Sequence, residues 1–150
     1  MPTILEHRTT SVLLIDANQD DRTFYADGLK RCAPDYLIIE ADDGEIGRQV
    51  YRCVRIDCVV LELALPDRSG FKVILDLIPL ASRPNASRPN VAVIVLTLIE
   101  HPGVHELVKQ SGAHACLVKA HTSPEDLDRA IQRALALVGQ MPKEDRYLTS

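Results

Sequence analysis

The chain has 150 residues and a formal net charge of −4, with 46% hydrophobic and 25% charged residues. This length suits one domain with its own core, and the composition is that of a globular protein. No apolar run approaches the roughly 18 residues of a membrane span, and no block of basic residues marks a nucleic-acid surface. We therefore expect neither a membrane nor a nucleic-acid partner.

The N-terminal segment MPTILEHRTT lacks the basic region and the long apolar region of a secretory signal, so we expect a cytoplasmic protein. The four cysteines form no CxxC pair and lie in largely apolar contexts, which predicts buried free thiols and no disulfide or metal site. They are Cys32, Cys53, Cys58 and Cys116. The five histidines fall in predicted tails, loops or helix ends, where solvated side chains are expected.

Five short runs rich in Val, Ile and Leu predict strands at residues 11–15, 36–39, 58–63, 91–96 and 115–119. Four of these runs are continuous rather than alternating, which is typical of strands covered on both faces. The segments between and after them have apolar residues at helical spacing. The residues that mark the five helices are Phe24, Leu29 and Cys32; Ile46, Val50 and Val54; Phe71, Ile74 and Ile78; Val104, Leu107 and Val108; and Leu127, Ile131, Ala134 and Val138. Strands alternating with helices predict an α/β fold with a parallel sheet.

The last predicted helix has the clearest start. Ser123 is a suitable N-cap, Pro124 suits the first helical position, and Glu125 and Asp126 complement the positive end of the helix dipole. We place the domain at residues 11–138, with an N-terminal tail at 1–10 and a C-terminal tail at 139–150. The tandem repeat ASRPNASRPN at residues 81–90 predicts a loop before the fourth strand, with a binding role as the alternative.

Polar residues stand where the predicted strands end, and ligands of open parallel sheets bind beyond the carboxyl ends of the strands. These residues are Asp16, Glu62, Thr97 and Lys119, with Asp20 and Asp21 in the first turn of the following helix. The first strand is followed by DANQDDR rather than a glycine-rich loop, so a nucleotide site of that kind is not indicated. No ordering of Ser, His and Asp or of Cys and His indicates a nucleophilic enzyme, and we expect none.

The chain resembles the receiver domain of two-component response regulators over residues 11–138. The matching segments, in order, are LLID, EADDGEIG, VVLELALPDRSGFKVI, VIVLT, and SGAHACLVK followed by SPEDL. The resemblance implies a flavodoxin-like (βα)5 doubly wound sheet with strand order 2-1-3-4-5. It also implies an aspartate after the third strand that takes a phosphoryl group from a histidine kinase. Two acids after the first strand would hold Mg²⁺, and a Thr or Ser and a Lys would contact the phosphoryl oxygens.

Several positions depart from this pattern. Thr97, Lys119 and Asp16 match it, but Ala17 replaces the second acid and Glu62 stands at the phosphoacceptor position. Mg²⁺ prefers near-octahedral oxygen ligands, so Ala17 removes one of them. Glu62 is one methylene longer than Asp, and a displacement on the order of 1 Å can cost about a hundredfold in rate.

Three more departures lie near the site. Leu98 adds bulk where the family has a small residue, Cys116 replaces an aromatic switch residue, and Ala120 replaces a proline that commonly has a cis bond. We expect a trans bond before Ala120. We also expect no metal, or weak Mg²⁺ binding at most through Asp16 and Glu62. Asp20 and Asp21 are interpreted as acids that favour a helix start.

These residues predict an atypical receiver, not phosphorylated in the usual way, that acts through protein–protein interaction. Glu62 is expected to pair with Lys119, either as a partial mimic of a phosphoryl group or as an inert remnant pair. One alternative is a working phosphoacceptor with a rearranged Mg²⁺ site that uses Asp20 or Asp21. The other is a small-molecule sensor on the same fold.

The expected partners are a histidine kinase, a downstream regulator or a second copy of the chain. The resemblance places that contact on the face of the fourth helix, fifth strand and fifth helix. Val104, Leu107, Leu135 and Leu137 are the apolar residues predicted there.

Overall fold

The computed structural model describes residues 9–81 and 91–139. Its strands and helices alternate along the chain as the sequence predicts. In chain order they are β1 (Thr10–Ile15), α1 (Gln19–Cys32), β2 (Tyr36–Ala41), α2 (Gly44–Cys53), β3 (Cys58–Leu61), α3 (Gly70–Ala81), β4 (Ala92–Thr97), α4 (Pro102–Gln110), β5 (Ala115–Val118), the short 3₁₀ helix η2 (Lys119–His121) and α5 (Pro124–Leu137). The predicted tails and the ASRPN tandem lie almost wholly outside the described residues.

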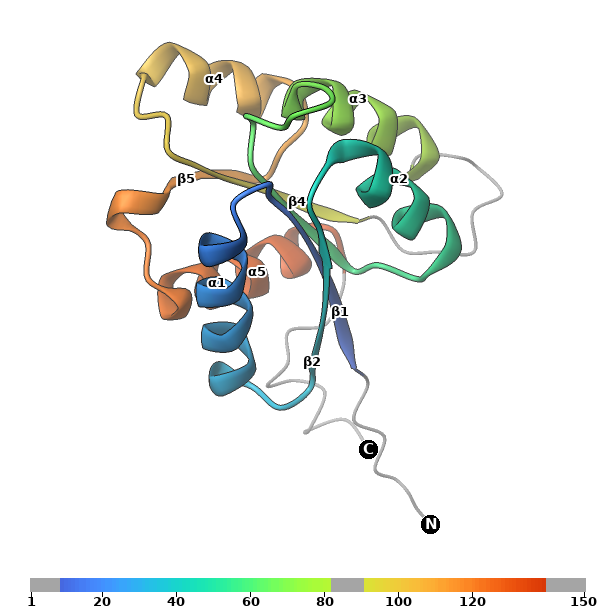
Figure 1. The fold of residues 1–150 in the computed structure, drawn as a ribbon, viewed down its shortest axis with the longest axis vertical. Coiled ribbons are helices and arrows are strands. Elements are labelled where there is room, and N and C mark those ends of the chain that lie inside the picture. The colour runs from blue at the N-terminus through green and yellow to red at the C-terminus, as the bar shows by residue number, and fades with distance from the viewer. Residues whose placement is uncertain (1–8, 82–90, 140–150) are drawn as a thin grey trace.

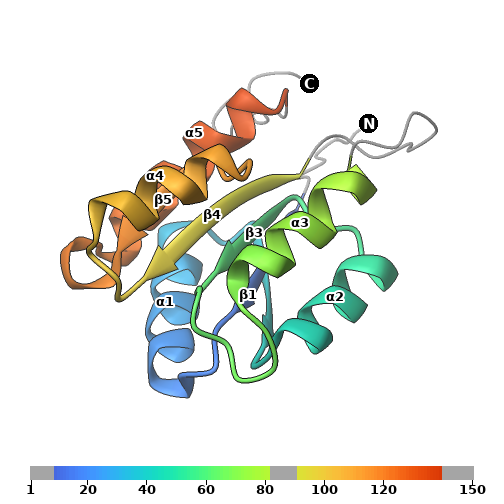
Figure 2. The same ribbon diagram turned by 90° about the horizontal axis from the view of Figure 1, so that it is seen from above.

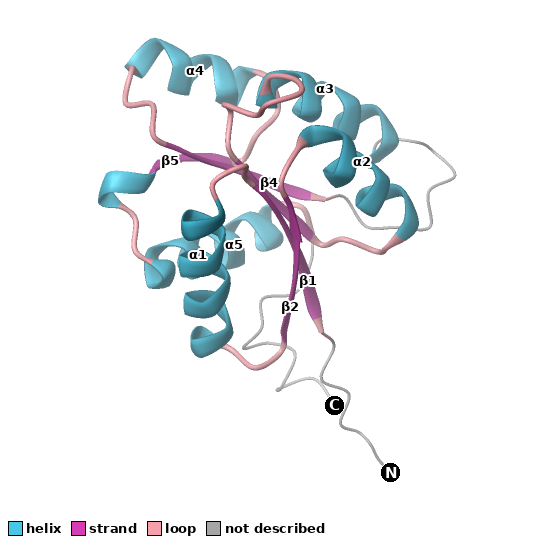
Figure 3. Ribbon diagram, in the orientation of Figure 1, coloured by secondary structure: helices cyan, strands magenta, loops and turns pink. Residues whose placement is uncertain are grey.

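The five strands form one parallel sheet in the order β2-β1-β3-β4-β5. Helices α1 and α5 cover one face, and α2, α3 and α4 cover the other (Figures 1 and 3). This arrangement confirms the predicted doubly wound fold. The order reverses beside β1, so the carboxyl ends of β1 and β3 border the crevice where ligands bind in such sheets.

Burial explains why the central strands are continuous apolar runs. Every residue of β3 and β4 is buried, whereas all four residues of β5 are only half-buried because β5 is an edge strand. Alternate residues of β1 point to opposite faces: Val12 and Leu14 join the core under α1 and α5, and Leu13 and Ile15 join the core under α2, α3 and α4. Figure 2 shows the sheet twisting between these two helical layers.

The helices lie where the apolar spacing predicts them. Some of the apolar residues that indicated these helices, however, are exposed and do not pack in the core. Phe24 is exposed, and the neighbouring Tyr25 takes the buried position on α1. Ile46 and Val54 are also exposed, because α2 packs through the glycine at position 47 and through Tyr51. A Cβ at Gly47 would lie 2.5 Å from Ile15 Cδ1, so the close contact of α2 with β1 requires glycine there.

Other predicted positions also need correction. Leu135 is wholly buried, so it belongs to the core and not to the outer face predicted for it, whereas Leu107 is exposed on that face as expected. Cys53 is exposed, whereas Cys58 is buried as expected. Strand β3 ends at Leu61, two residues earlier than predicted, and the chain bends at Leu63.

The start of α5 is confirmed in detail. Ser123 is the N-cap and its hydroxyl accepts the Asp126 N–H, while the Asp126 carboxylate accepts the Ser123 N–H. This reciprocal pair is a capping box. None of the helices in the described ranges is long and apolar enough to cross a membrane.

Candidate functional site

Three carboxylates meet one ammonium group at the carboxyl-terminal edge of the sheet. Lys119 Nζ lies 2.6 Å from Asp16 Oδ2, 2.8 Å from Asp21 Oδ2 and 3.1 Å from Glu62 Oε1. The Lys119 side chain is only 5% exposed. The predicted contact of Glu62 with Lys119 is therefore present. Asp21 does more than favour a helix start, because its carboxylate reaches the same ammonium.

Glu62 is held by a ring of donors besides Lys119. Its Oε2 accepts the N–H groups of Leu63 at 2.6 Å and Ala64 at 3.4 Å. Its Oε1 accepts the N–H of Leu98 at 3.3 Å. Successive backbone N–H groups of this kind form an anion-binding concavity. The carboxylate of Glu62, the residue that follows β3, thus lies among donors that favour a negative charge.

The cluster has an excess of negative charge. Asp16, Asp21 and Glu62 bring three carboxylates against one ammonium, and only Asp21 is substantially exposed, at 32% of its side chain. Burial alone would lower the pKa of Lys119, but hydrogen bonds to Asp16 and Asp21, and the charges of Asp16 and Glu62, outweigh it and raise that pKa above its usual value. Lys119 is therefore a fixed cation at neutral pH.

Arg22 and Asn18 hold Asp16 in place. The Asn18 N–H donates to Asp16 Oδ1, and Arg22 Nη1 donates to the Asp16 carbonyl at 2.5 Å. Arg22 is anchored in turn by Glu40, with its Nε 3.2 Å from Glu40 Oε1. The first turn of α1 thus fixes the carboxylate against Lys119.

Tyr25, which the sequence analysis did not single out, bonds to the backbone next to the Lys119 side chain. Its hydroxyl lies 2.8 Å from the Thr122 carbonyl and 3.3 Å from the Lys119 carbonyl. Tyr25 follows Asp21 by one helical turn on the same side of α1, which is the only sequence signal that could have indicated it. The bond between Lys119 and Ala120 is trans, as expected, and Ala120 lies in η2.

The remaining predicted residues differ in their exposure. Ala17 and Asp20 are exposed at the start of α1. Thr97 is fully buried, and its hydroxyl accepts the Ile99 N–H at 3.2 Å. Leu98 is 65% exposed and contributes its N–H to Glu62.

Cys116 is half-buried on β5. Burial chiefly raises the pKa of the Cys116 thiol, with Lys109 lowering it and Glu62 raising it further. A neutral thiol at this position has neither the size nor the ring of an aromatic switch residue.

The donor set has the chemistry that Mg²⁺ prefers, since three carboxylates supply hard oxygen ligands. The ammonium of Lys119, however, occupies the point on which these oxygens converge. Within residues 9–81 and 91–139, no group of three or more His, Cys, Asp or Glu side chains is arranged to hold a metal ion. In this arrangement the three carboxylates hold the Lys119 ammonium.

Comparison with known proteins gives one family. The model described as the response regulator receiver domain matches residues 12–132. A chemotaxis protein CheY4 from Vibrio cholerae superposes with a TM-score of 0.72 at 22% identity, covering 84% of this chain and 98% of that one. A CheY-like receiver domain protein from Methanospirillum hungatei gives 0.74 at 18% identity, covering 92% and 98%. At these identities the two structures show a shared fold.

A curated relative is 28% identical over 103 residues, and is described as a "Probable cyclic di-GMP phosphodiesterase" of Vibrio cholerae. The match covers 69% of this chain and 22% of that protein. The chain thus spans less than a quarter of the relative's length.

Proposed function

The chain belongs to the response regulator receiver domain family, and from this premise we propose that it is a receiver that signals without taking a phosphoryl group. A receiver domain is a signalling module rather than an enzyme. The phosphodiesterase activity in the name of the longer relative is therefore not proposed for this chain. What carries the proposal is the Glu62 carboxylate, which is bound on both oxygens.

The contacts of both carboxylate oxygens of Glu62 support this proposal. A phosphoacceptor needs a free carboxylate oxygen that can attack, whereas Glu62 Oε1 contacts Lys119 and the Leu98 N–H, and Oε2 contacts the N–H groups of Leu63 and Ala64. Phosphoryl transfer depends on positioning and on neutralising charge. Here the groups that would neutralise an incoming phosphoryl are already engaged by the longer side chain.

In this proposal the Lys119 ammonium supplies the positive charge that a metal ion supplies in other receivers. Its ammonium contacts Asp16 and Asp21 as well as Glu62, so one internal cation holds the acids together. With Ala17 in place of the second acid, the metal ligand is missing from the sequence too. The site would thus be locked in one charge arrangement, and regulation would come from partner binding.

The face formed by α4, β5 and α5 is the proposed contact surface for a kinase, a regulator or a second copy of the chain. Strand β5 is half-buried along its length, and Leu107 and Leu137 are exposed on the flanking helices. Cys116 on β5 lacks the ring through which the family couples its site to this face.

One observation favours the competing hypothesis of a working phosphoacceptor. The carboxylate of Asp21 enters the site from α1, so it could supply the metal ligand that Ala17 lacks. Binding of Mg²⁺ by Asp16, Asp21 and Glu62 would require the Lys119 ammonium to move away from these three carboxylates.

Mass spectrometry after incubation with acetyl phosphate and Mg²⁺ tests the proposal. We expect no phosphoryl adduct on the chain as it stands, and no saturable beryllofluoride binding. The matched control is the double variant Ala17→Asp with Glu62→Asp, which restores both family carboxylates and is expected to gain one phosphoryl group. A phosphoryl adduct mapped to Glu62 in the unaltered chain would refute the proposal and favour the working phosphoacceptor.

A further inference from the structure

A second concave site lies on the face covered by α2 and α3, away from the strand-end cluster. Its volume is about 660 Å³, within the range of roughly 300–1,000 Å³ of small-molecule sites. The two helices lie side by side in both views of the fold (Figures 1 and 2). The lining residues are Glu45, Arg48, Arg52, Asp67, Arg68, Lys72, Leu75 and Asp76.

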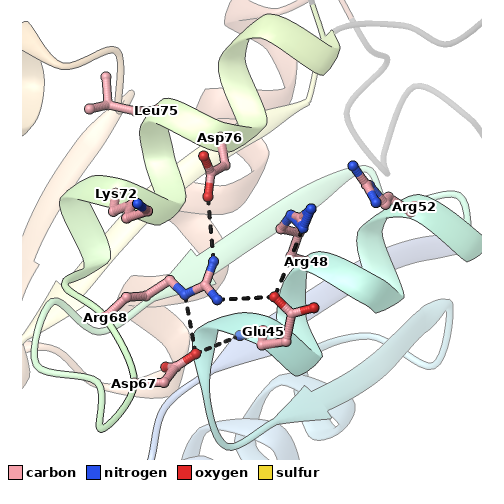
Figure 4. Close-up of a pocket in the computed structure, with 8 residues that line it drawn as sticks. All are labelled: Glu45, Arg48, Arg52, Asp67, Arg68, Lys72, Leu75 and Asp76. Atoms are coloured by element: carbon pink, nitrogen blue, oxygen red, sulfur yellow. Dashed lines mark hydrogen bonds and ion pairs between the residues drawn. The ribbon is translucent and has the colours of Figure 1, made fainter.

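Arg68 neutralises the carboxylates of this pocket. Its guanidinium reaches Glu45 at 3.0 Å, Asp67 at 3.1 Å and Asp76 at 3.6 Å (Figure 4). Asp67 also accepts the N–H groups of Gly44 and Glu45 at the start of α2. The hydrogen bond from Gly44 leads the effects that lower the pKa of Asp67, so this carboxylate stays ionised and occupied within the protein.

Three other cations line the same pocket with little or no internal neutralisation. Arg48 makes only a 3.9 Å contact with Glu45, which is shared with Arg68. Neither Arg52 nor Lys72 has a carboxylate partner in the described part of the chain. The pocket therefore has four cations against three acids, although the chain as a whole has a net charge of −4. Such a local excess of positive charge attracts anions.

The placement of these cations indicates the shape of the anion. Arg48 and Arg52 are four residues apart and lie on one side of α2, while Lys72 stands on α3, on the other side of Arg68 (Figure 4). Guanidinium groups bind phosphate oxygens through two parallel hydrogen bonds, and an ammonium acts as a point charge. Two separated positive poles suit a ligand with two linked phosphates. Leu75, which is 61% exposed at the same pocket, offers an apolar surface to an organic group.

We propose that the pocket between α2 and α3 binds a small molecule with a diphosphate group, held by Arg48, Arg52 and Lys72. The proposal is independent of the fate of Glu62, because none of these residues contacts the strand-end cluster. It makes the α2–α3 face a ligand-sensing surface of the receiver, separate from the contact face at α4, β5 and α5.

Calorimetric titration of the full chain, without divalent ions, tests this site with inorganic pyrophosphate and with adenosine diphosphate. We expect saturable binding below about 10 mM that weakens at higher salt. Tighter binding of adenosine diphosphate would identify the organic group as part of the ligand, and equal binding would assign the affinity to the phosphates. Both results support a diphosphate site. No saturation with either ligand would overturn it.

A matched pair of variants checks the location. Arg52→Ala with Lys72→Ala is expected to weaken binding about a hundredfold, since it removes two charge-assisted contacts that are each worth about a factor of ten. Arg133→Ala with Lys30→Ala removes the same charge from exposed positions outside the pocket, and should change binding by less than about twofold. An equal loss of affinity in both double variants would show that binding depends only on the overall charge of the protein, and would overturn the proposal.

Amide chemical shifts of the unaltered chain give a readout that does not depend on any variant. Perturbations at residues 44–53 and 68–76 are expected with pyrophosphate. Perturbations confined to the edge around Asp16, Glu62 and Lys119 would place the ligand elsewhere and refute the α2–α3 site.

Discussion

Replacing Lys119 with methionine would leave three carboxylates facing one another without their shared cation. The contacts to Nζ are 2.6 Å, 2.8 Å and 3.1 Å long, and each is worth about 5–6 kcal/mol of Coulomb attraction at an effective dielectric constant near 20. Oxygens of Asp16 and Glu62 that both touch Nζ cannot be more than about 6 Å apart, so each like-charge pair repels by about 3 kcal/mol or more.

These gross terms do not convert directly into stability, because desolvation of the ammonium opposes them and water screens the partly exposed Asp21. Removing one partner of a buried ion pair costs about 3–5 kcal/mol. We expect Lys119→Met to lose that amount in urea unfolding at neutral pH, with the midpoint moving by about 1.5–3 M. Lys30→Met, at an exposed position on α1, is the control and should lose less than about 1 kcal/mol.

A further measurement on Lys119→Met tests the reason for that loss. Mg²⁺ should stabilise the variant, by about 2.7 kcal/mol at a hundred times its dissociation constant, but not the unaltered chain. A loss below about 1 kcal/mol, or equal stabilisation of both proteins by Mg²⁺, would refute the idea of one shared internal cation.

Three other changes have defined outcomes. Tyr25→Phe removes the hydroxyl that bonds the Thr122 carbonyl, and should cost about 1 kcal/mol in urea unfolding; an unchanged midpoint would mean that this bond does not support the loop. Burial chiefly lowers the pKa of His114, so as the pH falls the unfolded chain protonates this imidazole before the folded chain does. The contribution of His114 to the stability of the fold is therefore complete above about pH 6.5, and it is lost as the pH falls through the lowered pKa of the folded chain. His114→Asn should flatten that part of the stability–pH curve, and an unaltered slope would exclude His114 as its source. Ser123→Ala breaks the capping box of α5 and should cost about 1 kcal/mol by thermal unfolding, whereas Ser123→Asp, which keeps an acceptor, should cost much less.

The strand-end edge was largely predictable, because the ends of parallel strands meet on one side of a sheet wherever the helices dock. Asp16, Glu62 and Lys119 each follow a strand, and the structure brings them together. Asp21 was underestimated because an acid in the first turn of a helix has a local explanation that needs no partner. Its contact with Lys119 joins residues 98 positions apart, and depends on how α1 packs against the sheet.

Leu98 is a second residue whose role could not be predicted from the sequence, because it acts through its backbone. The sequence places a bulky side chain beside the site, yet that side chain is mostly exposed and the N–H is what reaches Glu62. The direction of a side chain after a strand depends on the turn that follows, and apolar periodicity carries no information about it. The buried faces of α1 and α2 were mistaken for similar reasons, since the amphipathic Tyr25 and Tyr51 fill buried positions that the sequence analysis assigned to neighbouring apolar residues.

The sequence by itself determined the alternation of strands and helices, the strand order through the family resemblance, and the carboxylate at the end of β3. The alternation is a periodic property, which the burial of one strand or helix face is enough to impose, whereas the strand order came from the matching motifs and the carboxylate from its position among them. Only the tertiary structure decided that one ammonium serves three acids, and that Arg68 takes up the three carboxylates of the α2–α3 pocket. Both arrangements depend on long side chains from separate elements meeting within about 4 Å, where electrostatic energy changes steeply with distance.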